Sequence, residues 1–89
     1  MNVRVLFFAS LREKVKKSET RQTVADGATV GDLWASLCRE HAALEPMTAS
    51  VSFAVNREYA TRDVVLSDDD EVALIPPVSG GVDTSRAAV

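Results

Sequence analysis

The stretch TVGDLWASLCREH, residues 29–41, has the clearest helical periodicity in this chain of 89 residues. Its apolar side chains recur every three or four residues and form one stripe, made of Val30, Leu33, Trp34, Leu37, Cys38 and His41. Thr29 is a good helix N-cap, and Asp32, three residues later, is a short-armed version of the capping-box acid. The helix is predicted to end around residues 42–44, before Pro46. Such a stripe indicates one main helix that packs one side against a sheet.

Strand patterns precede this helix. Residues 2–8 form a dense run of β-branched and aromatic side chains, and because apolar residues point to both faces, a central strand is predicted. A short amphipathic helix follows over residues 10–16, with Ser10 as its expected N-cap. Residues 19–25 alternate weakly and are predicted to form a second strand. The spacing leaves open whether this strand runs parallel or antiparallel to the first.

Further strand patterns follow the helix. Residues 51–55 alternate between apolar and polar side chains, as in a half-buried strand, and a turn leads into a short strand at residues 59–61. Residues 71–75 form the last strand, which Pro76 and Pro77 end because proline cannot donate to a ladder. This order of elements predicts an α+β fold, in which a mixed sheet has one main helix packed on one face.

Size and composition exclude several classes of protein. A chain of 89 residues with 46% apolar and 26% charged side chains fits one globular domain without room for a deep enclosed active site. No apolar run approaches the ~18 residues of a transmembrane helix. The single cysteine excludes an internal disulfide framework and a multi-cysteine zinc site. With no such apolar run and no signal peptide, we expect a cytoplasmic domain that does not enter a membrane, and the net charge of −3 argues against nucleic-acid binding.

Few residues suggest chemistry of their own. The acidic run 68–71 could hold calcium, but it lacks the ligand spacing and the glycine of an EF-hand loop, so a solvated turn is the favoured interpretation. Cys38 and His41 could act as a nucleophile and a base, yet structural roles are favoured on an apolar helix face. Residues 1–25 carry six basic groups against two acids, which could steer an acidic partner, although a solvated surface is favoured. No metal site is predicted.

The most informative remaining stretch is the C-terminal segment IPPVSGG, residues 75–81. Two prolines hold the exit from the last strand extended, and two adjacent glycines then form a thread without side chains. Such a thread can enter a narrow channel and present a carboxyl group to another enzyme. The alternative is an ordinary flexible linker, which is common at chain ends.

Four segments resemble the molybdopterin synthase small subunit (MoaD) family, in the order and spacing of that family. They are VRVLFFASLRE at 3–13, TVGDL at 29–33, AVN at 54–56 and DEVALIPPVSGG at 70–81. The resemblance implies a ubiquitin-like β-grasp fold and a sulfur-carrier role for residues 1–81. Carriers for thiamine or cysteine synthesis share the Gly-Gly end, but their openings are less like this one.

The resemblance also implies the chemistry of the tail. In that family a ubiquitin-activating-type adenylating enzyme (MoeB type) uses ATP to activate the carboxylate of the final glycine, which becomes a thiocarboxylate. Carried over here, Gly81 bears the sulfur and Gly80 gives it room, while Pro76, Pro77, Val78 and Ser79 form the inserting arm. The tail enters the large subunit of molybdopterin synthase (MoaE type), where the sulfur helps to build a dithiolene on cyclic pyranopterin monophosphate. This chain is then a sulfur-donating, non-catalytic subunit with no permanently bound cofactor.

Docking on such partners requires a surface. A β-grasp sheet has one face covered by its helix and one face open, and apolar residues such as Phe8 or Leu6 on the open face would mark the docking surface. Alternation alone does not decide which side chains point outward, because both faces of residues 2–8 are apolar. Phe53 and Tyr59 are weaker candidates, with core packing as the alternative.

The chain departs from the family in one respect, because eight residues, 82–89, follow Gly81. Gly81 in a peptide bond has no carboxylate to activate. A processing protease removes the extension, or the extension begins a linker to a fused large subunit, or sulfur transfer has been lost and docking kept. We expect removal, since a small polar segment next to glycine is easily cleaved. The alternative function is a β-grasp protein modifier or a non-catalytic docking module.

Overall fold

The computed structural model describes residues 1–77. Val78, Ser79, Gly80 and Gly81 of the predicted arm, and the predicted extension 82–89, lie outside the described residues. The elements are β1 (Asn2–Phe7), α1 (Ala9–Val15), β2 (Glu19–Thr23), α2 (Val30–Glu40), the 3-10 helix η1 (Ala42–Met47), β3 (Ser52–Val55), β4 (Glu58–Ala60) and β5 (Glu71–Ile75).

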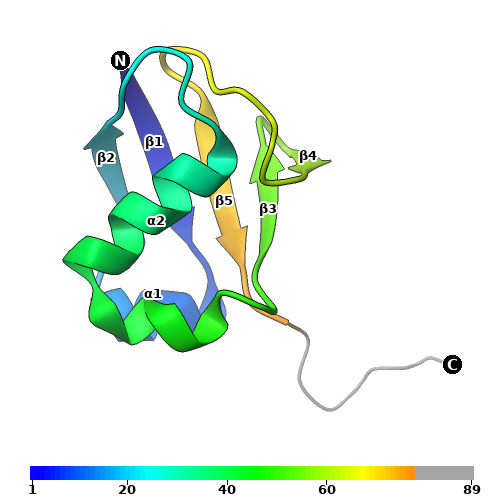
Figure 1. Cartoon of the computed structure of the whole chain (residues 1–89). Coiled ribbons are helices and arrows are strands. Elements are labelled where there is room, and N and C mark those ends of the chain that lie inside the picture. The colour runs from blue at the N-terminus through cyan, green and yellow to red at the C-terminus, as the bar shows by residue number, and fades with distance from the viewer. Residues whose placement is uncertain (78–89) are drawn as a thin grey trace, which may run out of the picture.

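Within this range five strands form one mixed sheet in the order β2-β1-β5-β3-β4 (Figure 1). β1 is antiparallel to β2 and parallel to β5, and β3 is antiparallel to both β5 and β4. The direction of β2, which the spacing left open, follows from the short return after α1. Lys16 adopts a left-handed conformation that ends α1, and the Phe7 N–H then donates to the Ser18 carbonyl at 2.9 Å. The predicted α+β fold is confirmed.

The core lies between the sheet and α2, which crosses one face of the sheet in Figure 1. Val3, Val5 and Phe7 of β1 point toward α2 and are buried. The predicted stripe on α2 is buried from Val30 to Cys38, and the capping box between Thr29 and Asp32 is present. These matches confirm the main helix. They also show which face of β1 is buried, because only one of its two apolar faces meets the helix.

Two helix boundaries differ from their predictions. α2 ends at Glu40, and Pro46 lies inside η1 rather than beyond the helical region. The fixed φ of proline suits a 3-10 turn, which explains why the chain stays helical there. The predicted N-cap Ser10 is also wrong, since α1 begins at Ala9 with Phe8 as its N-cap and no side-chain bond. β1 passes directly into α1, so the extended residue before the helix is the aromatic one.

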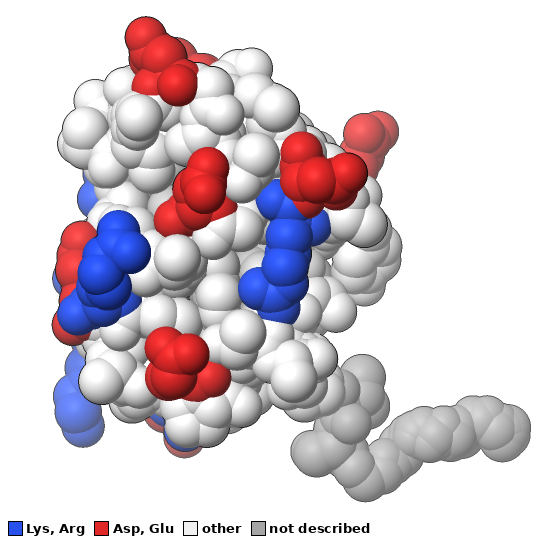
Figure 2. Space-filling view, viewed as in Figure 1, with Lys and Arg blue, Asp and Glu red and all other residues white. Residues whose placement is uncertain are grey.

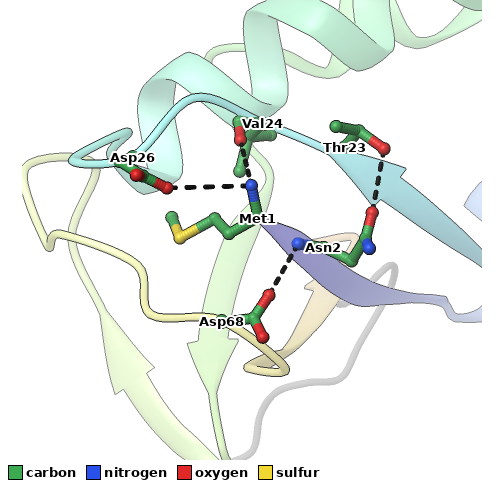
Figure 3. Close-up of polar contacts among 6 residues, drawn as sticks. All are labelled: Met1, Asn2, Thr23, Val24, Asp26 and Asp68. Atoms are coloured by element: carbon green, nitrogen blue, oxygen red, sulfur yellow. Dashed lines mark hydrogen bonds and ion pairs between the residues drawn. The ribbon is translucent and has the colours of Figure 1, made fainter.

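Polar contacts fasten the end of the sheet where β1 begins (Figure 3). The Met1 ammonium group donates to the Val24 carbonyl at 2.9 Å and lies 3.8 Å from the carboxylate of Asp26. The backbone N–H of Asn2 donates to the Asp68 carboxylate at 2.8 Å. Because β1 and β5 are parallel, this end lies opposite the end where the chain leaves β5. No helix within residues 1–77 is long and apolar enough to cross a membrane.

Candidate functional site: the open face of the sheet

The two faces of the molecule differ in character. On the face that carries α2, basic and acidic groups are interspersed (Figure 2). The opposite face of the sheet has an apolar hollow, lined by Leu6, Phe8, Ala54, Arg57, Tyr59, Glu71, Ala73 and Ile75. A contiguous apolar patch with a polar rim is typical of a surface that binds a partner. The hollow is therefore the candidate docking site.

The hollow follows from the strand register. Leu6 of β1 pairs with Ala73 of β5, Ala73 pairs with Ala54 of β3, and Ala54 pairs with Tyr59 of β4. The two alanines are each 8% exposed and form the floor. Larger side chains stand on both sides of them, and Tyr59 is 81% exposed. Small residues between large ones thus create a shallow concave surface.

Phe8 and Ile75 close the end of the hollow from which the tail departs. Phe8 is 44% exposed, and its backbone N–H donates to the Leu74 carbonyl at 3.4 Å. Ile75 is the last residue of β5, and the half-buried Pro76 and exposed Pro77 follow directly. The start of the predicted arm is therefore continuous with the hollow.

Charged groups form one rim of the hollow. The Glu71 carboxylate, whose side chain is 16% exposed, accepts from the Arg4 guanidinium at 2.5 Å. The Arg57 guanidinium lies 3.8 Å from the same carboxylate and is 88% exposed. A half-buried carboxylate costs less when a cation pairs with it, and Arg4 supplies that partner for Glu71 beside the apolar floor.

Three of the four predicted docking residues line the hollow, and the fourth is in the core. Leu6, Phe8 and Tyr59 belong to the hollow. Phe53 does not, because it is 4% exposed and packs edge-on against Trp34 with ring centroids 5.8 Å apart. For Phe53 the core interpretation is correct, since alternation along β3 points it toward α2.

The other candidates for chemistry have structural roles. Burial raises the pKa of the Cys38 thiol, so this residue behaves as a small apolar side chain. His41 caps the C-terminus of α2 and lies edge-on to Phe7. In the acidic run, Asp70 accepts from the backbone N–H of Ser67 at 2.8 Å. The run thus serves as a turn, as predicted, and residues 1–77 contain no cluster of three or more side chains suited to a metal.

The sequence analysis did not propose five of the residues that line the hollow, namely Ala54, Arg57, Glu71, Ala73 and Ile75. Ala54 and Ala73 are informative only once their larger neighbours are known, and Arg57 was assigned only to a turn. The signal that points to Arg57 is its place directly after Asn56, because this pair forms the two-residue loop between β3 and β4.

The sheet order, with α2 across one face, defines an α+β domain of the ubiquitin-like β-grasp class. Residues 5–81 match the ThiS family, and the chain belongs to that family. A relative from Chlamydomonas reinhardtii, the molybdopterin synthase sulfur carrier subunit, is 41% identical over 83 residues. The match covers 91% of this chain and 100% of the relative. The resemblance drawn from the four sequence segments is thereby confirmed.

Solved structures agree with this assignment. The SAMP1 structure from Haloferax volcanii has a TM-score of 0.83 and 32% identity, and the match covers 91% of this chain and 100% of that one. A complex of subunits 1 and 2 of the molybdopterin-converting factor from Helicobacter pylori contains a chain with a TM-score of 0.65 and 26% identity. That match covers 91% of this chain and 100% of the other.

Proposed function

We propose that this chain is the sulfur-carrier small subunit of molybdopterin synthase. The observation that carries the proposal is the continuity between the hollow and the start of the Pro-Pro-Val-Ser-Gly-Gly arm at the end of β5. A partner that covers the hollow receives the arm at a fixed position. The names of the curated relatives and the two-subunit complex from Helicobacter pylori support the same assignment.

The proposed chemistry takes place at the carboxyl carbon of Gly81. The carboxylate attacks the α-phosphorus of ATP on an adenylating enzyme, so that an acyl-adenylate forms and pyrophosphate leaves. A sulfide equivalent then attacks the acyl carbon, AMP leaves, and a thiocarboxylate remains. The terminal sulfur is the nucleophile that the large subunit directs to the pterin precursor. The partners supply the catalytic groups, and this chain supplies the carried atom and the docking surface.

Removal of residues 82–89 is a required step in this proposal. With these residues attached, the carbonyl of Gly81 belongs to an amide, which has no carboxylate oxygen to attack ATP. The form that ends at Gly81 is then the active carrier. Gly80, without a side chain, allows a narrow channel to close around the arm.

Intact-mass spectrometry tests the proposal with three forms of the chain: residues 1–89, residues 1–81 and residues 1–80. Each is incubated with the adenylating enzyme, ATP and sulfide. We expect only the form ending at Gly81 to gain the mass of one oxygen-to-sulfur exchange. The form ending at Gly80 is the matched control, since it has the same fold and a terminal glycine one residue too short. Sulfur on the full-length chain with residues 82–89 still attached would contradict the processing step.

A second candidate is a protein modifier, favoured by the high similarity to SAMP1, which in related solved structures is called small archaeal modifier protein 1. In that case Gly81 forms an isopeptide bond with lysine side chains. The two functions separate on a denaturing blot of cells that express residues 1–81. A ladder of covalent conjugates favours the modifier, whereas a single low-mass band favours the carrier.

A further inference from the structure

The turn between β3 and β4 places an arginine, Arg57, in a left-handed backbone conformation. Asn56 has φ of 51° and Arg57 has φ of 73°, so both central residues of this two-residue loop lie in the left-handed region. Such a pair is the pattern of a type I′ hairpin turn, in which asparagine suits the first position and glycine the second. A side chain at the second position is strained, and a strained residue persists where its surroundings or its function require it.

The fold explains the asparagine. Its backbone N–H donates to the Glu71 carbonyl at 2.8 Å, and its side-chain oxygen accepts from the Glu71 N–H at 3.1 Å. Its amide nitrogen donates to the Asp70 carboxylate at 2.9 Å. These bonds hold the turn against the start of β5. They also place Arg57, the next residue, above Glu71 at the rim of the hollow.

The fold does not explain the arginine. Its nearest charged partner, the Glu71 carboxylate, is 3.8 Å away and already accepts from Arg4 at 2.5 Å. An ion pair of an 88% exposed side chain contributes little to folding. Among residues 1–77, no hydrogen bond fixes the Arg57 guanidinium. The bonds of Asn56 hold the turn, but the Arg57 side chain itself makes no hydrogen bond within the described part of the chain that would favour arginine over glycine at this position.

The surroundings of Arg57 indicate what it binds. Two arginines share one carboxylate at this rim, which leaves one positive charge beside the hollow. A guanidinium has a planar fork of donors that matches a carboxylate, and arginine and tyrosine are enriched among residues that dominate protein interfaces. Tyr59 stands two residues further along and lines the same hollow. The apolar floor and the Glu71 carboxylate favour a protein over a polyanion.

We infer that Arg57 is a specificity-determining residue, which binds a carboxylate side chain of the large subunit next to the apolar groups that fill the hollow. This inference rests on the proposed function and adds to it the chemistry of the partner surface: an apolar projection flanked by an aspartate or glutamate.

The variant Arg57→Gly separates docking from folding, because it supplies the residue that the turn prefers and removes the guanidinium. We expect its urea midpoint to rise, while its dissociation constant for the large subunit from the same organism increases by about tenfold, as for the loss of one charge-assisted pair. Its binding also becomes less dependent on salt. Lys16→Gly is the matched control, since Lys16 is an exposed cation with φ of 65° at the C-cap of α1, outside the hollow. It should raise the midpoint and leave docking unchanged.

Two results overturn the inference while the proposed function stands: an Arg57→Gly variant that binds the large subunit as tightly as the parent, or an Arg57→Gly midpoint below that of the parent. The first shows that no carboxylate meets the guanidinium, and the second shows that the fold itself uses the arginine. A parent chain, ending at Gly81, that does not bind the large subunit at all overturns the proposed function, and the inference with it.

Discussion

Removal of the Phe8 ring measures how much the hollow contributes to docking. Phe8 is 44% exposed. An aromatic side chain presents ~150–250 Å² of surface, so about 90 Å² of Phe8 is available to a partner. At ~25 cal/mol for each Å² of apolar surface removed from water, Phe8→Ala should weaken binding by about 2 kcal/mol. That corresponds to an increase of roughly 30-fold in the dissociation constant for the large subunit.

Titration calorimetry with the purified large subunit gives the dissociation constant, and far-UV circular dichroism shows that the variant is folded. Val65→Ala is the control, because Val65 is 61% exposed but does not line the hollow. It should change the dissociation constant by less than about threefold. The reasoning is refuted if Phe8→Ala binds like the parent, or if both variants weaken binding equally, since exposure alone would then account for the loss.

Three further predictions concern the fold. Trp34 is 3% exposed and donates to Thr48 at 3.0 Å, so Trp34→Ala should cost about 3–5 kcal/mol in urea unfolding followed by circular dichroism, and a loss below about 1 kcal/mol would contradict its place in the core. Thr29→Ala removes the capping bond to the Asp32 N–H and should cost about 1 kcal/mol in the same assay, whereas Thr29→Ser should restore most of it. Because burial raises the pKa of Cys38, less thiolate is present at neutral pH, and iodoacetamide should react at least about tenfold more slowly than with the unfolded chain; equal rates would show that the thiol is accessible.

Most of the fold was predictable because its periodicities are strong. The stripe from Val30 to Cys38 has only one helical interpretation, and the two prolines can only end the last strand. The orientation of β1 was not predictable, because both of its faces are apolar. The decision comes from the packing of Val3, Val5 and Phe7 against α2, which follows later in the chain. Tertiary packing of this kind leaves no local signal in the strand.

The site was predictable in part. Leu6 and Phe8 were proposed from their apolar character, and the register places both in the hollow. The floor and the charged rim were not anticipated. Alanines form a concave floor only where larger side chains stand beside them, and these neighbours are known only once the strands are paired. An arginine in a turn resembles any solvated residue until its φ and the shared carboxylate are known. The strain, rather than the residue type, is the informative property.

The position of β5 between β1 and β3 also has a mechanical consequence. A force applied at Ile75 along the axis of β5 loads both hydrogen-bond ladders of this strand in shear. The bonds must then break together rather than one after another. The central place of β5 therefore makes the end of the described chain a mechanically strong point of the sheet.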